Sequence, residues 1–225
     1  MPLGPCPLVP AVRSESELTE RPEKALVSKS LFQTTWDLVG APFRLLLFDQ
    51  NWLPRFGWTT LEEERLIAVW PHLRGCVLDI GAGPNTLIRR YEKGVGVDVV
   101  DWGGGALVVE NSSRLPFADG AFETVTLIAC LNHIPYREET LREARRLLSP
   151  NGRLIVTMIN PLLGRIGHAL WWYSEDKHRG GMQVGEVGGM WIRDIVNLCT
   201  AAHFELERHE RFVYFMNHLL VFRAI

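Results

Sequence analysis

The chain has 225 residues, of which 47% are hydrophobic, and its formal net charge at pH 7 is −2. This size and apolar content are typical of one α/β domain with a single large core, and the scattered lysines and arginines exclude a basic surface for nucleic acid. No apolar run approaches the ~20 residues of a membrane span, and no signal peptide is visible at the N-terminus, so we expect a cytoplasmic protein.

The first 73 residues are predicted to lie outside the core domain. Residues 1–28 carry four prolines in their first ten positions, which favours a disordered tail. Residues 29–73 are predicted to form a helical cap, in which the aromatic segment Leu31 to Trp58 precedes a capping box that begins at Thr60. The aromatic segment either packs over the core, covers a hydrophobic ligand or makes a peripheral membrane contact.

The core domain, residues 74–225, opens with the run Val77 to Asn85, in which a buried strand turns into a helix. Gly81 and Gly83 let the backbone of this turn approach a ligand closely. Nineteen residues after Asp79, a second apolar strand ends in Asp98. An acidic residue at this spacing binds a ribose diol in doubly wound folds, so the pattern indicates a cofactor that contains a nucleoside.

The turn also indicates which nucleoside cofactor is bound. Thr86 occupies the position of the third glycine of the dinucleotide fingerprint, and Asp79 would repel a pyrophosphate. The carboxylate of Asp79 instead suits a ligand that carries an amine. The D-x-G-x-G pattern that begins at Asp79 resembles the first motif of class I S-adenosylmethionine-dependent methyltransferases. The stretch Arg114 to Val125 resembles their L-P-F-x-D-x-x-F-D-x-V motif, with Glu123 in place of aspartate.

This resemblance covers residues 74–160 and implies a fold. The expected architecture is an α/β, Rossmann-like, doubly wound sheet of seven strands, mostly parallel with the last strand antiparallel, and helices on both faces. The connection from Val99 to Gly105 is too short for the usual crossover helix, so we expect a glycine loop there, with Trp102 near the adenosine. A helix from about Ile192 and a final antiparallel pair, including residues 211–215, complete the expected fold.

The resemblance also implies the residues that bind S-adenosylmethionine. Asn111 stands where the family often has an aspartate that contacts adenine, and asparagine can still accept a hydrogen bond there. The implied cofactor-binding residues are Asp79, Gly81, Ala82, Gly83, Asp98, Val99, Asn111, Ser112 and Cys130.

His133 is the candidate general base, because it follows the fourth strand, whose carboxyl end faces the cleft. The alternative is that His133 only fastens its loop through hydrogen bonds.

The acceptor pocket is expected in the insertion at about 160–190, where glycines alternate with aromatic and polar residues. The candidate acceptor-binding residues are Asn132, Trp172, His178, Arg179 and Glu186. The histidines and carboxylates show no compact spacing of the kind that metal ligands have, so no metal site is predicted. The four cysteines show no C-x-x-C pair, and Cys76 and Cys130 are expected to be reduced.

These observations predict an enzyme that methylates a small, apolar or aromatic metabolite, with oxygen favoured over nitrogen or carbon as the acceptor atom. A non-catalytic subunit that binds S-adenosylmethionine, or a nicotinamide-dependent oxidoreductase, are the alternatives. The sequence does not predict an oligomeric state.

Overall fold

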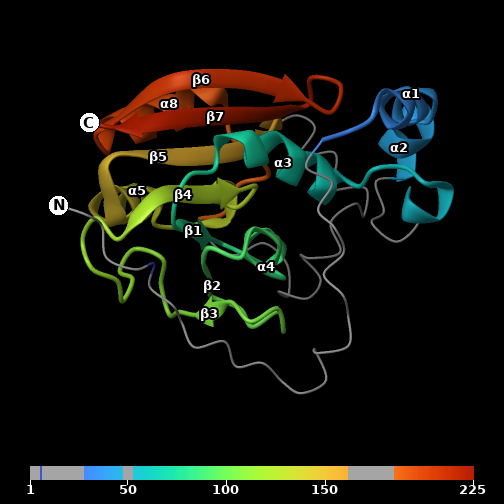
Figure 1. Cartoon of the computed structure of the whole chain (residues 1–225). Coiled ribbons are helices and arrows are strands. Elements are labelled where there is room, and N and C mark those ends of the chain that lie inside the picture. Colours follow the sequence, from blue (N-terminus) through green and yellow to red (C-terminus); the bar gives the residue numbers. More distant parts are fainter. Residues whose placement is uncertain (1–5, 7–27, 48–52, 162–184) are drawn as a thin grey trace, which may run out of the picture.

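A seven-stranded sheet forms the centre of the computed structural model, which describes residues 6, 28–47, 53–161 and 185–225 (Figure 1). The strand order is β3-β2-β1-β4-β5-β7-β6. β1 to β5 pair in parallel, and β7 runs antiparallel to both β5 and β6. The strands are β1 (Val77–Ile80), β2 (Gly94–Asp98), β3 (Leu107–Val108), β4 (Phe122–Ile128), β5 (Leu148–Ile159), β6 (Phe204–Phe212) and β7 (Asn217–Ala224). The predicted fold class is confirmed.

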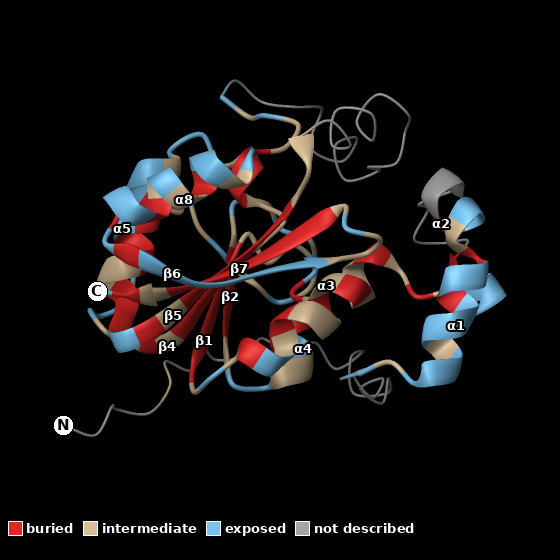
Figure 2. Ribbon diagram, turned by 90° about the horizontal axis from the view of Figure 1, so that it is seen from above, coloured by how far each residue is buried: buried red, intermediate tan, exposed pale blue. Residues whose placement is uncertain are grey.

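Helices cover both faces of this sheet, as Figure 2 shows. α5 (Arg137–Leu147) and α8 (Ile192–Ala201) bury leucine, isoleucine and alanine side chains against one face. α3 (Leu61–Val69) and α4 (Thr86–Tyr91) cover the other face, where Leu66 packs with Val77 and Val69 packs with Ile155. Strands buried on both faces explain the nearly continuous apolar runs in the sequence of the central strands.

The remaining helical elements are short. Three 3₁₀ segments lie in the connections, and α1 and α2 stand beyond the edge of the sheet (Figure 2). They are η2 (Leu53–Phe56), η3 (Trp70–His72), η4 (Leu131–His133), α1 (Leu31–Val39) and α2 (Ala41–Leu47). Among the described helices, none combines the length and the apolar character needed to cross a membrane.

The connection between β2 and β3 contains no helix, as its short sequence predicts. Its glycines pack against the turn after β1: a Cβ atom on Gly104 would lie 2.1 Å from the carbonyl oxygen of Pro84. Asn85 donates a side-chain hydrogen bond to the Gly104 carbonyl at 3.2 Å. The loop and the turn therefore form one layer at the carboxyl ends of β1 and β2.

Two sequence predictions are wrong in detail. Residues 213–215, predicted within the final strand pair, form the hairpin turn between β6 and β7, and all three have positive φ angles. Cys76, predicted to be reduced, forms a disulfide with Cys6, with a Cα–Cα distance of 5.5 Å. The pairing escaped the sequence analysis because the partners are 70 residues apart and share no motif.

Removal of this disulfide is expected to lower the free energy of unfolding by about 4 kcal/mol, because the crosslink closes a long loop and restricts the unfolded chain. The measurement is urea unfolding of the Cys6→Ser variant beside the oxidised parent chain. The parent chain in reductant should show the same fall, since it loses the crosslink without any substitution. An unchanged unfolding free energy for Cys6→Ser would show that the crosslink does not form in solution.

Candidate functional site

A cavity of about 220 Å³ opens where β1, β2 and β4 end. Its walls come from the turn after β1, the tip of β2, the loop after β4 and one face of α3. In a doubly wound sheet this edge, at the point where the strand order reverses, is the usual place for a ligand. The cavity is therefore the candidate site.

The turn after β1 forms the floor of the cavity. Gly81 has φ +73°, and a Cβ atom there would lie 2.7 Å from the Cβ of Cys130. Gly83 has φ +52°, and a Cβ atom there would meet no protein atom within 4 Å. Gly81 is thus required by packing, whereas Gly83 keeps the cavity open and lets a ligand approach the backbone.

Asp98 lies at the tip of β2 with its carboxylate fixed by two backbone groups. Its Oδ2 atom accepts a hydrogen bond from the Gly83 N–H at 2.8 Å, and Oδ1 accepts from the Val100 N–H at 3.0 Å. Each carboxylate oxygen can accept a further hydrogen bond. Because Asp98 lines the cavity, it offers a rigid pair of acceptors to the hydroxyl groups of a ligand.

Asp79 is a buried carboxylate in the wall of the same cavity. Burial, opposed by a 2.6 Å hydrogen bond from Thr126 and reinforced by the charge of Asp98, raises the pKa of Asp79 to about 7. In the described part of the chain, no lysine or arginine forms an ion pair with it. A ligand that brings a positive charge would therefore find a matching carboxylate here.

Because its pKa is higher in the folded chain, Asp79 should destabilise the protein at alkaline pH. The folded state retains this proton up to about pH 7, whereas the carboxyl group in the unfolded chain, with its ordinary pKa of 3.8, loses it at lower pH. The free energy of unfolding therefore falls as the pH rises from about 4 to 7. We expect Asp79→Asn to stabilise the ligand-free chain at pH 8 by up to about 4 kcal/mol.

The test is urea unfolding of Asp79→Asn and the parent chain at pH 5 and pH 8. The gain in stability should be larger at pH 8. Asp194→Asn, a change of an exposed carboxylate on α8, serves as the control and should show no such difference. A gain for Asp79→Asn that is equal at both pH values would contradict the raised pKa.

His133 lines the cavity at the end of η4 and is paired with Glu186. The His133 Nδ1 and Glu186 Oε2 atoms are 3.3 Å apart, and the exposed fractions of the two side chains are 21% and 1%. The glutamate thus lies behind the imidazole, away from solvent, while the imidazole reaches the cavity. This arrangement orients the ring.

The segment that carries Glu186 is bound to the loop after β4. Asn132 accepts a hydrogen bond at its carbonyl from the Val187 N–H, and its side chain donates to the Val187 carbonyl, both at 3.0 Å. Arg137 donates to the Gly185 carbonyl at 2.7 Å and to the Asn132 carbonyl at 2.9 Å. Burial lowers the pKa of the Arg137 guanidinium, and the charge of Glu186 opposes this effect. These bonds hold Glu186 in place.

The remaining candidate residues divide into three groups. Ala82, Val99, Ser112 and Cys130 line the cavity, as does Trp102. Asn111 accepts a hydrogen bond from the Ser113 N–H at 2.7 Å through the side-chain oxygen that was predicted to face adenine. Trp172, His178 and Arg179 lie outside the described residues.

The contribution of α3 to the cavity was not predicted from the sequence. Glu62, Arg65 and Leu66 line it, and the Arg65 Nε atom is buried without a hydrogen-bond partner within the described structure. The capping box in the sequence predicts where α3 begins. Which face of α3 lines the cavity depends on how the helix packs, and the capping box does not predict that. Across the described ranges, no three His, Cys, Asp or Glu side chains are grouped closely enough to hold a metal ion.

Residues 78–156 match the family described as "Methyltransferase domain". The chain is also 30% identical over 116 residues to a ubiquinone/menaquinone biosynthesis C-methyltransferase from Ectopseudomonas mendocina, a match that covers 40% of this chain and 45% of the relative. A similar enzyme from Bordetella avium is 29% identical over 118 residues, with 44% and 46% covered. The chain therefore spans less than half the length of these curated relatives.

Solved structures share the fold at low sequence identity. A SAM-dependent methyltransferase from Thermotoga maritima superposes with a TM-score of 0.57 at 18% identity, covering 86% of this chain and 98% of that protein. A 1,6-didemethyltoxoflavin N1-methyltransferase from Burkholderia thailandensis, solved with S-adenosylhomocysteine bound, gives 0.51 at 18% identity, with 71% and 76% covered.

Proposed function

We propose that this chain is a class I S-adenosylmethionine-dependent methyltransferase that transfers a methyl group to a small acceptor with an apolar or aromatic body; the match of residues 78–156 to a methyltransferase domain and the similarity to curated methyltransferases support this. Oxygen is the favoured acceptor atom. The observation that carries this proposal is the pair of His133 and Glu186 at the wall of the cavity.

The polar groups around the cavity fit S-adenosylmethionine. The buried carboxylate of Asp79 suits the ammonium group at the methionine end, and Arg65 would bind the carboxylate beside it. Asp98 would accept hydrogen bonds from the ribose hydroxyl groups, and Gly83 leaves room for the backbone to approach the ligand. When bound, the cofactor supplies an electrophilic methyl group on its sulfonium.

In this proposal His133 removes the proton from the acceptor hydroxyl group. An imidazole that donates its Nδ1–H to a carboxylate accepts a proton at Nε2. Glu186 then stabilises the imidazolium across the 3.3 Å contact. The remaining rate enhancement comes from alignment of the acceptor and exclusion of water.

A second candidate is methylation at carbon. The curated relatives named above are C-methyltransferases of quinone biosynthesis, and removal of a phenolic proton by His133 would also increase the nucleophilicity of the neighbouring ring carbons. Both reactions would use the same residues up to methyl transfer.

The experiment is incubation of the chain with S-adenosylmethionine that carries a deuterated methyl group and a panel of phenols and hydroquinones. Mass spectrometry would detect methylated products, and NMR would locate the deuterated methyl on oxygen or carbon. A product methylated at oxygen would support the favoured proposal, and one methylated at carbon would support the second. Cofactor binding with no transfer to any member of the panel would favour a non-catalytic subunit.

A further inference from the structure

Helix α1 turns its polar face toward the protein and its apolar face toward solvent. Its buried residue is Asp37, whereas Leu31, Phe32, Leu38 and Val39 are 63–90% exposed. At about 100° per residue, these four side chains lie on one stripe opposite Asp37, on either side of Thr35, whose hydroxyl donates to the Leu31 carbonyl. Figure 2 shows α1 at the end of the molecule, largely exposed. This orientation is the reverse of the usual one for a surface helix.

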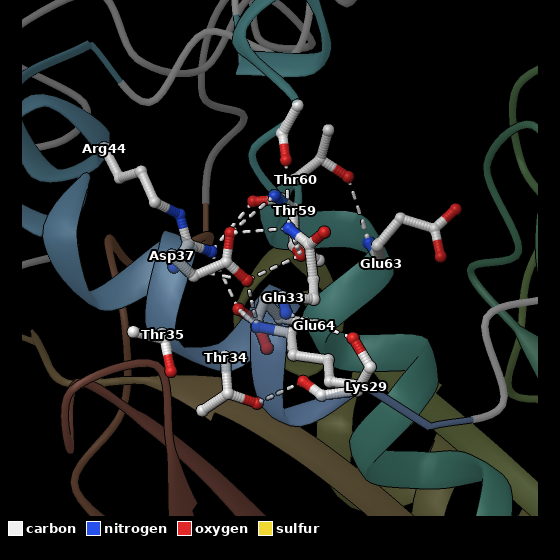
Figure 3. A network of polar contacts seen from close by, with 12 residues as sticks. Lys29, Gln33, Thr34, Thr35, Asp37, Arg44, Thr59, Thr60, Glu63 and Glu64 are labelled. Carbon is white, nitrogen blue, oxygen red and sulfur yellow. Dashed lines mark hydrogen bonds and ion pairs between the residues drawn. The ribbon is translucent and has the colours of Figure 1, made fainter.

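A buried polar network holds α1 in this orientation (Figure 3). Asp37 accepts hydrogen bonds from the Thr59 N–H at 2.9 Å and the Thr59 hydroxyl at 2.7 Å, and it pairs with Lys29 at 2.6 Å. Gln33, one turn earlier on α1, donates to Asp37 at 3.1 Å. Burial alone would raise the pKa of Asp37, but these donors hold it below its usual value.

Arg44 of α2 connects this network to the core. It donates to Glu64 of α3 at 2.7 Å and to the Thr59 carbonyl at 2.8 Å. Lys29 also pairs with Glu64, so two cationic and two anionic side chains neutralise one another. Burial opposes the charged form of Arg44, but the hydrogen bond to Glu64 holds the pKa of its guanidinium above the usual value. A balanced buried network is costly to break, which fixes the outward direction of the apolar stripe.

The hairpin between β6 and β7 reaches the same network. The Tyr214 hydroxyl accepts a hydrogen bond from Arg44 at 2.6 Å and donates to the Asp37 carbonyl at 2.6 Å. Val213, Tyr214 and Phe215 all have positive φ angles, a conformation that is unfavourable for residues with side chains. This turn leaves Phe215 73% exposed, next to Tyr214, which contacts α1, so elements far apart in the sequence present apolar side chains at one end of the molecule.

The surface formed in this way, here called the apolar end, has a distinctive composition. In the described residues 28–47 and 53–60 the single carboxylate is that of Asp37, which is buried, so this part of the surface presents no negative charge. Arg55 is its exposed charged residue. The apolar end consists of Leu31, Phe32, Trp36, Leu38, Val39, Phe43, Phe56 and Phe215, which are 42–90% exposed.

We propose that the apolar end inserts into the headgroup region of a phospholipid surface. Leucine and aromatic side chains on an otherwise uncharged, outward-facing helix match that region, where apolar burial provides the affinity. Within the described residues 28–47 and 53–60, no exposed carboxylate would repel lipid phosphates, and the small number of exposed cations means that binding does not require anionic lipid. The inference does not depend on the proposed reaction.

The test is flotation of the full chain with phosphatidylcholine vesicles. The parent chain should float with the vesicles equally at 0.1 M and 0.5 M NaCl, since apolar insertion is insensitive to screening. Phe32→Ser combined with Leu38→Ser should lower the partition coefficient at least about tenfold. The matched control is Val108→Ser combined with Ile225→Ser, which removes exposed apolar side chains away from α1 and should leave flotation unchanged.

Three outcomes would overturn the proposal: no flotation, flotation only with anionic lipid at low salt, or a lipid-free dimer that the Phe32 and Leu38 changes dissociate. The last would assign the apolar end to a second copy of the chain. Sedimentation velocity without lipid distinguishes it, and circular dichroism checks that each variant folds. None of these measurements uses methyl transfer. A failure of lipid binding can therefore be distinguished from a failure of the proposed function.

Discussion

Replacement of His133 with alanine is expected to lower kcat for methyl transfer by about 10²–10⁴-fold, the usual contribution of a general base. Affinity for S-adenosylhomocysteine should change little, because the role proposed for His133 is to receive the acceptor proton. Free imidazole in the buffer should restore part of the activity. Glu186→Gln should lower kcat about tenfold and change its pH profile, since the amide retains a hydrogen bond but loses the charge behind the ring.

His209→Ala is the matched control, because His209 lies on the edge strand β6 and contacts His218 rather than the cavity. Its kcat should equal that of the parent chain. If His133→Ala loses stability and cofactor affinity together, and imidazole restores nothing, then His133 only fastens its loop. Normal turnover by His133→Ala would also contradict the role of base.

Replacement of Asp98 with alanine is expected to lower affinity for S-adenosylhomocysteine by at least about 100-fold. The carboxylate would accept two hydrogen bonds from the ribose, and such bonds to a charged group are worth about 1.5–3 kcal/mol each. Loss of the bond to the Gly83 N–H would also loosen the turn that forms the cavity floor. Calorimetric titration of the variant measures the change.

Glu110→Ala is the control for this variant, because Glu110 is an exposed carboxylate just beyond β3 and does not line the cavity. Its affinity should match that of the parent chain. A folded Asp98→Ala variant with unchanged affinity would show that the ribose does not bind at the tip of β2.

The sequence predicted those parts of the site that local motifs encode. Gly81, Gly83 and Asp98 belong to two strand-end patterns whose spacing follows from the parallel pairing of β1 and β2, and the structure brings them to one cavity. The short connection before β3 was likewise predictable, because its length rules out a crossover helix.

Contacts between distant segments could not be predicted from local patterns. Glu186 lies 53 residues after His133, and the sequence analysis assigned it to acceptor binding rather than to a position behind the imidazole. The direction of α1 shows the same limit. Its apolar spacing would suit a helix packed on the core, and only the buried partners of Asp37 reveal that the stripe faces outward.

The central claim is that the cavity binds S-adenosylmethionine, and calorimetric titration of the purified chain with S-adenosylhomocysteine, beside NAD, tests it most directly. We expect micromolar binding of S-adenosylhomocysteine, at least about 100-fold weaker binding in Asp98→Ala, and no heat from NAD. Binding of NAD in preference to S-adenosylhomocysteine, or no binding of S-adenosylhomocysteine, would contradict the assignment of the turn at Gly81 and Gly83.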